Sequence, residues 1–180
     1  MKILGIDPGL RIIGFGVIIK EKNNLNYINS GVIRIPMDNL PFRLRLIYKS
    51  VEDLVENYKP DYAAIEKIFV NLNPQSTLNL GHARGAAICG LVKNGLKVSE
   101  YSALQVKKAL VGHGMAKKRQ IQEMSKKILN LSFTPKTDAA DALGVAICHA
   151  NSSTYMSVLK DTGVDVSKKG ARIRNGRLIL

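Results

Sequence analysis

The chain has 180 residues, enough for one domain with a substantial hydrophobic core but not comfortably for two. Lysine and arginine total 27 against 14 acidic residues, and this formal net charge of +13 favours a polyanionic partner such as nucleic acid. No apolar run approaches the roughly 18 residues of a membrane span, and the N-terminus "MKILGID" is too short and too soon acidic for a secretory signal, so neither a membrane protein nor a secreted one is expected.

Three strands are predicted first. β-branched residues fill 2–7 and 12–20 on either side of the turn "PGLR", and 25–35 follows the polar turn "EKNN". Strands joined in succession by short turns predict an antiparallel meander. Apolar residues then recur at helical spacing from Leu44 to Tyr58, and "KP" at 59–60 ends this helix.

The rest of the chain alternates between strands and helices. After the strand "DYAAIEKIF", the segment "NLNPQS" reads as a loop, and the next helix is rich in small residues. The predicted order is strand, helix, strand and three helices, at 61–69, 77–94, 97–101, 103–111, 116–130 and 135–150. This order predicts an α/β fold with a five-stranded mixed sheet, three antiparallel N-terminal strands and helices on both faces.

The chain is expected to form one domain, residues 1–150, followed by a basic tail, residues 151–180. The tail has six Lys or Arg residues against Asp161 and Asp165 and no apolar stripe, so we expect it to be ordered weakly or only on a partner. Cys89 and Cys148 lie in apolar helical contexts, which is typical of buried thiols in a reducing cytoplasm.

The predicted helix 135–150 carries two aspartates in an otherwise apolar sequence. Thr134 followed by Pro135 is typical of an N-cap with proline at the first helical position. Asp138 and Asp141 then share one side of a helix that is apolar almost all round and therefore buried. The helix dipole favours an acidic residue in the first turn, which accounts for Asp138 better than for Asp141.

Two further carboxylates end predicted strands. Asp7 precedes the turn Pro8-Gly9, and Glu66 closes "YAAIE"; each by itself is an ordinary turn residue or a solvated strand end. In sheets covered by helices, however, functional groups gather at strand ends and facing helix termini, where these two could meet Asp138 and Asp141. Four clustered carboxylates need protons or cations to neutralise them. An all-oxygen set suits Mg²⁺ or Mn²⁺, and two such ions would activate a water molecule and stabilise the leaving oxygen of a phosphodiester.

Several motifs together resemble the RuvC family of Holliday-junction resolvases. They are "GIDPG" at 5–9, "IE" at 65–66, "LGHARG" at 80–85, "QVKKALVGHG" at 105–114 and "DAADAL" at 138–143, in register from about residue 1 to 150. The resemblance implies a ribonuclease-H-like fold, a homodimer, and Mg²⁺-dependent paired nicking of a four-way DNA junction in recombination and repair. Its four acidic catalytic and metal-binding positions fall on Asp7, Glu66, Asp138 and Asp141. It also implies a branch-migration helicase complex as a partner.

The same resemblance assigns DNA contacts. Lys107 and Lys118 match basic positions that serve DNA phosphates near the active site, and they lie in a stretch with seven Lys or Arg residues between 103 and 127. Phe69 matches an aromatic that stacks on bases at the junction, where bases are already poorly stacked. Arg84 is a further candidate for a phosphate contact. Taken without the resemblance, these residues also fit a solvated basic face and a core aromatic.

Other functions fit parts of the sequence. "GIDPGLRIIGFGV" also resembles the first phosphate loop of actin-like sugar kinases and ATPases, but those proteins need a second, similar half for which 180 residues is too short. A metal-dependent nuclease of related fold that cuts structured RNA and a non-catalytic junction-binding protein are the remaining alternatives. Two symmetric cuts are most simply made by a two-fold dimer, and the helix 77–94, with Gly81, Ala83, Gly85, Ala86 and Ala87, is the expected interface.

Overall fold

The computed structural model describes residues 1–68, 73–161, 172–174 and 177–179, and side chains as far as residue 152. Its contacts divide the chain into two compact units, Met1–Ala150 and Asn151–Leu180.

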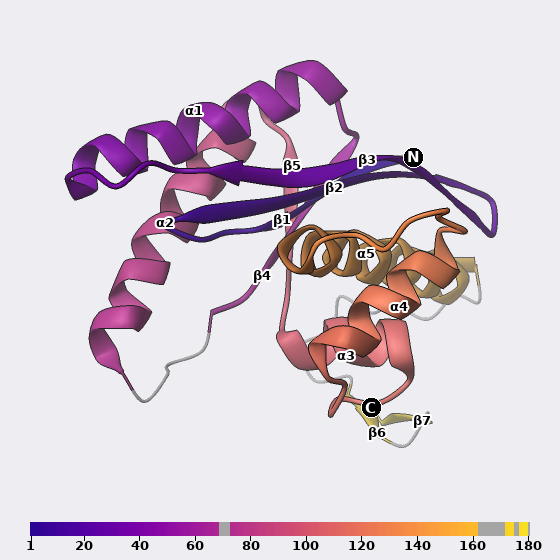
Figure 1. Ribbon diagram of the computed structural model, residues 1–180. Helices are drawn as coiled ribbons and strands as arrows, with labels where there is room; N and C mark the ends of the chain where they lie inside the picture. Colours follow the sequence, from indigo (N-terminus) through magenta and orange to yellow (C-terminus); the bar gives the residue numbers. More distant parts are fainter. Residues whose placement is uncertain (69–72, 162–171, 175–176, 180) are drawn as a thin grey trace. The chain divides into compact units, whose positions relative to one another are not determined.

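The first unit is built on a five-stranded mixed sheet in the order β3-β2-β1-β4-β5 (Figure 1). The strands are β1 (Lys2–Asp7), β2 (Ile12–Glu21), β3 (Asn24–Arg34), β4 (Tyr62–Glu66) and β5 (Lys97–Tyr101). β1, β2 and β3 form an antiparallel meander, whereas β4 is parallel to β1 and β5 is parallel to β4. The predicted mixed sheet with three antiparallel N-terminal strands is confirmed.

Helices cover both faces of this sheet, as predicted (Figure 1). One face carries α1 (Leu40–Tyr58) and α2 (Pro74–Val92), and the other carries α5 (Thr137–Asp161) with α3 (Ala103–Val111) and α4 (Lys118–Ile128) beside it. Two separate hydrophobic cores result, one on each face. Within the parts of the chain that the structure describes, no helix is long and apolar enough to span a membrane.

The alternation of side chains along β1 and β4 decides which residues face α5. Leu4 and Ile6 of β1 are buried in the core under α1 and α2, whereas Ile3 belongs to the core under α5. In β4, Ile65 faces α1 and α2 while Ala64 faces α5. Successive side chains of a strand point to opposite faces, so the last residue of each strand, Asp7 and Glu66, belongs to the α5 face.

Four helix starts differ from the sequence-based expectation: α1 begins at Leu40, four residues before the first periodic residue, Leu44, and α4 begins at Lys118 instead of residue 116. α2 begins at Pro74 instead of residue 77, because Asn73 acts as the N-cap and its side chain accepts a hydrogen bond from the Ser76 N–H at 3.2 Å. The N-cap predicted at Thr134 is wrong. α5 begins at Thr137 because the Pro135 carbonyl accepts a hydrogen bond from the Gln122 side chain at 2.9 Å, and the Lys136 carbonyl accepts the first helical one from Ala140 N–H.

α5 also extends further than predicted, to Asp161 instead of residue 150. In the second unit, β6 (Arg172–Arg174) and β7 (Arg177–Ile179) form a short antiparallel pair.

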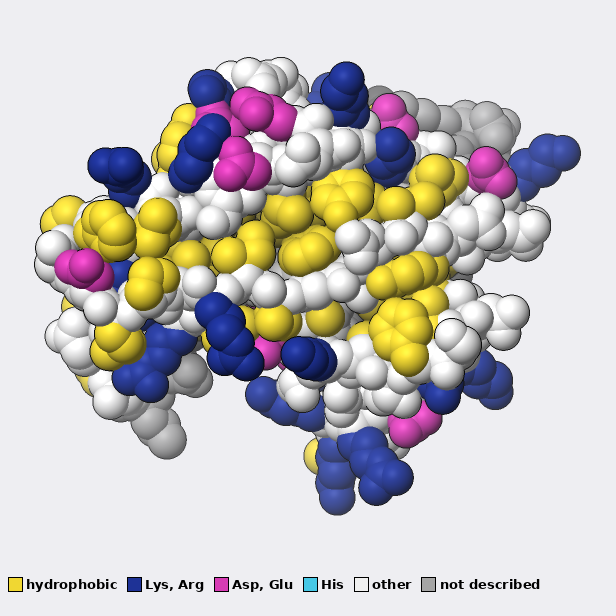
Figure 2. Space-filling view, turned by 45° about the horizontal axis from the view of Figure 1, so that its top comes forward, with side chains coloured by type: hydrophobic (Ala, Val, Ile, Leu, Met, Phe, Trp, Pro, Cys, Tyr) yellow, Lys and Arg dark blue, Asp and Glu magenta, His cyan; other side chains and the backbone are white. Residues whose placement is uncertain are grey.

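The expectation that both cysteines are buried holds for Cys148 but is wrong for Cys89, which lies on the exposed side of α2. In the face that Figure 2 shows, hydrophobic side chains form a band across the centre, and Lys and Arg side chains lie along both the upper and the lower margins.

Candidate active site

Asp7 and Glu66 are the last residues of two neighbouring parallel strands, β1 and β4, and lie at the same end of the sheet. The register of β1 with β4 runs from Ile3 opposite Tyr62 to Ile6 opposite Ile65, so the two acids follow the last paired residues directly. Because they also point to the same face, their carboxylates come together beneath the N-terminal end of α5. Ends of parallel strands are where α/β folds place their ligand sites.

Close contact between α5 and the sheet brings the two aspartates of the helix to this point. A Cβ built on Gly5 would lie 2.1 Å from the Ala142 carbonyl oxygen, and one built on Gly14 would lie 2.1 Å from the Asp138 carbonyl oxygen. Gly14 is also the cross-strand partner of Asp7. The helix backbone therefore rests on the strand backbone, next to Asp7, and only glycine permits this approach.

The four carboxyl groups lie close enough for their charges to act on one another. The pKa of Asp7 is raised from 3.8 to about 8, first by burial and then by the negative charges of Asp141, Glu66 and Asp138. Burial followed by the charge of Asp141 raises the pKa of Glu66. Burial also raises the pKa of Asp141, to which Asp138 adds. The structure thus brings all four predicted carboxylates together at one end of the sheet.

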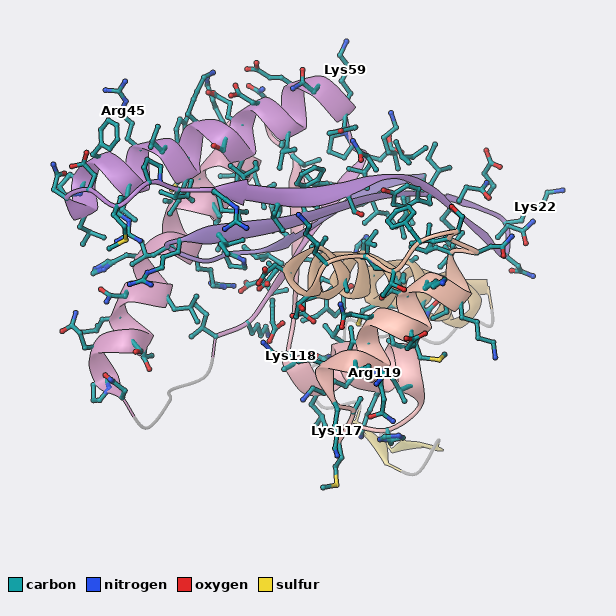
Figure 3. All side chains as sticks on the ribbon, in the orientation of Figure 1. Lys22, Arg45, Lys59, Lys117, Lys118 and Arg119 are labelled. Carbon is teal, nitrogen blue, oxygen red and sulfur yellow. The ribbon has the colours of Figure 1, made fainter. Side chains whose placement is uncertain are left out.

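Lys107 and Lys118 lie beside this acidic group. The charge of Lys107 lowers the pKa of Glu66 and of Asp141, and that of Lys118 lowers the pKa of Asp7 and of Asp141, both against the larger effect of burial. Figure 3 shows Lys118 at the start of α4, on the α5 side of the sheet, whereas Lys22, Arg45 and Lys59 lie elsewhere on the molecule.

Capping interactions fix the two helices that carry these lysines. Ser102 and Gln105 form a reciprocal capping box at the start of α3, with hydrogen bonds of 2.8 and 3.2 Å. At the start of α4, the Gln120 side chain accepts a hydrogen bond from the Lys117 N–H at 2.8 Å. Val106 and Ile121, in the core under α5, then hold the neighbouring lysines at the site.

Two adjoining pockets open on either side of Glu66. One, of about 250 Å³, is lined by Asp7, Pro8, Glu66, Lys67, Ile68, Leu80 and Ala103. The other, of about 210 Å³, is lined by Glu66, Ala103, Val106, Lys107, Ala116, Lys118, Ile121 and Asp141. A wider hollow of about 970 Å³ lies at the opposite ends of the parallel strands, near Met1, Tyr62 and Lys97, and contains none of the four carboxylates. The small pockets therefore mark the candidate site.

The four side chains have the chemistry of a site for a hard divalent cation. They offer only oxygen ligands, and burial, followed by the negative charge of neighbouring carboxylates, raises the pKa of Asp7, Glu66 and Asp141. Among the described residues, however, no group of three or more His, Cys, Asp or Glu side chains is already arranged to hold a metal ion.

The remaining predicted DNA contacts have different outcomes. Phe69 lies outside the described residues. Arg84, on α2, is directed towards the sheet: its Nε–H donates a hydrogen bond of 2.9 Å to the Glu66 carbonyl oxygen, and its guanidinium forms an ion pair with Glu100 of β5. Sequence analysis assigned no role to Glu100, Gly5 or Gly14. Glycines inside predicted strands do signal a close backbone approach, and "ILGID" and "IIGFGV" contain this signal.

Comparison with known proteins shows the same family over most of the chain. The family model described as "Crossover junction endodeoxyribonuclease RuvC" matches residues 3–149. A protein of that name from Herminiimonas arsenicoxydans is 60% identical over 179 residues, 99% of each chain, so the similarity continues past residue 150, where sequence analysis found none.

Solved structures agree. The RuvC structure from Thermus thermophilus has a TM-score of 0.77, with 30% identity over 87% of this chain and 97% of that one. The same protein in complex with Holliday junction substrate has a TM-score of 0.80 at the same identity and coverage. The fold is therefore ribonuclease-H-like, as expected. The chain belongs to the RuvC family of crossover junction endodeoxyribonucleases and is a nuclease.

Proposed function

We propose that this chain resolves four-way DNA junctions by paired, symmetric nicks, with Asp7, Glu66, Asp138 and Asp141 as its catalytic carboxylates. The observation that carries the proposal is the convergence of these four acids, from two strands and one helix, beside Lys107 and Lys118. A carboxylate cluster next to basic side chains suits a phosphodiester, because the acids hold cations and the lysines hold phosphate.

We infer that Mg²⁺, with Mn²⁺ as an alternative, binds the four carboxylates, with two ions in each site. Oxygen-only ligands favour these ions over zinc or copper, and four carboxylates leave coordination positions open for water and phosphate oxygens. When bound, the ions neutralise the acids and supply the Lewis acidity that phosphodiester hydrolysis needs. The pKa of Asp7 is raised to about 8, so this carboxyl group holds a proton at neutral pH. A bound cation would displace that proton.

The protein's own residues then orient the DNA. Lys107 and Lys118 line the same pocket as Glu66 and Asp141, so a phosphate held by their ammonium groups lies next to the carboxylates. Phe69, three residues after Glu66, is proposed to stack on a base at the crossover, as the family resemblance implies. The Thermus thermophilus relative, which was solved in complex with Holliday junction substrate, supports this choice of DNA substrate.

We also propose a homodimer, because two symmetric cuts need two sites related by a two-fold axis. α2 offers an exposed face for it. Leu78 and Val92 are 57% and 44% exposed, and Gly81 and Gly85 have open space around them. Part of the interface expected from sequence is wrong, since Ala83 and Ala87 are buried within the protomer.

A branch-migration helicase complex as partner, and a reducing cytoplasm as the location, remain proposals from the resemblance and from the cysteine content.

A nicking assay tests the function. A labelled four-way DNA junction is incubated with the protein in Mg²⁺ or in EDTA, beside linear duplex DNA, duplex RNA and the Asp7→Asn variant. We expect Mg²⁺-dependent symmetric cuts in the junction alone, and binding without cutting by Asp7→Asn. Preferential cutting of RNA would identify a nuclease for structured RNA, and junction binding without any cutting by the wild type would identify a non-catalytic binding protein.

A further inference from the structure

Arg84 connects helix α2 to the strand end that carries Glu66. Its Nε–H donates a hydrogen bond to the Glu66 carbonyl oxygen at 2.9 Å, and its Nη2 pairs with the carboxylate of Glu100. Only 18% of the Arg84 side chain is exposed. Three elements, α2, β4 and β5, therefore meet at one guanidinium.

The backbone around Glu66 explains why this contact matters. β4 ends at Glu66, which pairs with Tyr101, and the last β5 contact is made by the Lys67 N–H, which donates to the Tyr101 carbonyl at 2.7 Å. Beyond this point the ladder stops, so the Glu66 carbonyl is at the end of its strand. The Glu66 carbonyl and the Lys67 N–H belong to one planar peptide unit, so the bond to Tyr101 holds this unit on one side and the Arg84 Nε–H holds it on the other.

The forces on the Glu66 side chain make such a restraint necessary. Glu66 and Asp141 line one pocket, and the like charges of two carboxylates in one pocket repel each other. The backbone at Glu66 sets the direction in which its side chain leaves the strand. Fixing the Glu66 carbonyl therefore fixes the point from which the carboxylate reaches the pockets that it shares with Asp7 and Asp141.

We propose that Arg84 is a positioning residue for Glu66, held in place by Glu100, and does not contact DNA phosphate. The inference rests on the proposed function, because it assumes that Glu66 binds a catalytic cation. The guanidinium fork suits this role, since it reaches a carboxylate and a carbonyl at once from one rigid plane. Nε and Nη2 of Arg84 are already engaged within the protein, so a phosphate would have to reach Nη1 or compete with Glu100.

Three variants separate positioning from phosphate contact: Arg84→Met, Arg84→Lys and Glu100→Gln. Arg45→Met, on α1 and far from the site, removes the same charge as a control (Figure 3). Four quantities are measured: junction affinity against salt concentration in EDTA, the nicking rate at saturating protein, the Mg²⁺ concentration for half-maximal nicking, and the Mn²⁺-induced rise in melting temperature without DNA.

Positioning predicts a nicking rate lowered by roughly tenfold or more in all three variants, a higher Mg²⁺ requirement and a smaller Mn²⁺-induced stabilisation. Junction affinity and its salt slope should match those of Arg45→Met for the arginine variants. Arg84→Lys should not restore the nicking rate, because an ammonium group cannot bond the Glu66 carbonyl and the Glu100 carboxylate together as the planar guanidinium does.

A phosphate contact predicts the reverse pattern, and it would overturn the proposal. Arg84→Met would lose affinity and reduce the salt slope by about 0.9 relative to Arg45→Met, lysine would restore binding, and Glu100→Gln would bind more tightly while cutting normally. If Arg84→Met does not fold, Glu100→Gln decides alone, since Glu100 is 46% exposed and tolerates an amide. Wild-type protein that fails to nick would refute the proposed function instead, whatever the variants do.

Discussion

The backbone carbonyl of Asp138 lies directly over Gly14, so closely that a Cβ at residue 14 would be 2.1 Å from the carbonyl oxygen. Gly14 is paired with Asp7 across the β1–β2 hairpin. A glycine in the middle of a strand therefore sets the distance between carboxylates that are 131 residues apart in sequence. The position of α5 on the sheet is the geometric basis of the site.

We predict that Gly14→Ala displaces the first turn of α5. The added methyl group meets backbone, which cannot swing aside as a flexible side chain would, so unfolding free energy should fall by roughly 1–3 kcal/mol and junction nicking should drop in the fraction that stays folded. Thermal unfolding and nicking rates measure the two effects. Equal melting temperatures for Gly14→Ala and the wild type would contradict the close contact.

Asp7→Asn should stabilise the metal-free protein. The pKa of Asp7 is about 8 in the folded state against an ordinary 3.8, so between these values the unfolded chain releases a proton that the folded chain retains. Wild-type stability should therefore fall as pH rises from about 4 to about 8 and then level off. The amide of Asp7→Asn does not titrate, so the stability of this variant should depend much less on pH.

At pH 7 we expect the Asn variant to be more stable by roughly 0.5–2 kcal/mol, and at pH 4 to match the wild type. Chemical denaturation in EDTA across this pH range measures the difference. A wild-type stability that rises towards pH 8, or one that the amide leaves unchanged in slope, would show that Asp7 is not held in a repulsive, buried setting.

Lys118→Met should weaken junction binding and make it less dependent on salt. Each phosphate contact contributes a slope of about 0.9 to the fall of log K with log salt, so the variant should lose about that amount. Fluorescence anisotropy in EDTA between low and moderate salt gives the slope. Lys22→Met, at the distant β2–β3 turn, removes the same charge (Figure 3) and should keep the wild-type salt slope. Identical salt slopes in the two variants would show that Lys118 does not contact a phosphate.

Leu78→Asp should convert a dimer to monomers. Leu78 is exposed on the same helix as Val92, and an aspartate in an apolar interface has no partner. Sedimentation velocity should show a dimer for the wild type and a monomer for the variant, which should then nick one strand of the junction without the coordinated second cut. Phe42→Asp, on α1, changes an exposed apolar residue outside α2 and serves as the control. A wild-type monomer that still makes paired cuts would refute the proposed dimer.

Much of the fold followed from the sequence because local signals agreed with the global arrangement. The strands 2–7 and 97–101 and the helix 103–111 occur at the predicted residues, since alternation, β-branching and the Ser102 cap all favour them. The errors lie at the ends of elements: the strand expected over 61–69 ends at Glu66, α5 continues to Asp161, and helix starts are displaced. The carbonyl of Pro135 is bound by Gln122, from another helix, and no local pattern reports such a tertiary contact.

The candidate site was predictable in composition but not in geometry. Carboxylates at strand ends and on a buried helix indicated a cluster, and family motifs selected the same four residues. The contribution of Gly14, and the engagement of Arg84 with Glu66 and Glu100, depend on contacts between elements distant in sequence. Sequence alone predicts a phosphate contact for Arg84, and its contacts with Glu66 and Glu100 are visible only in the structure.

Direct measurement of Mn²⁺ binding by electron paramagnetic resonance, at neutral pH and without DNA, tests the central claim most closely. We predict that the wild type binds Mn²⁺ and releases protons as it does so, and that each of Asp7→Asn, Glu66→Gln, Asp138→Asn and Asp141→Asn weakens binding by at least roughly tenfold. Unchanged Mn²⁺ affinity in any one of the four variants would remove that residue from the site, and unchanged affinity in all four would contradict the convergence of carboxylates on a shared cation.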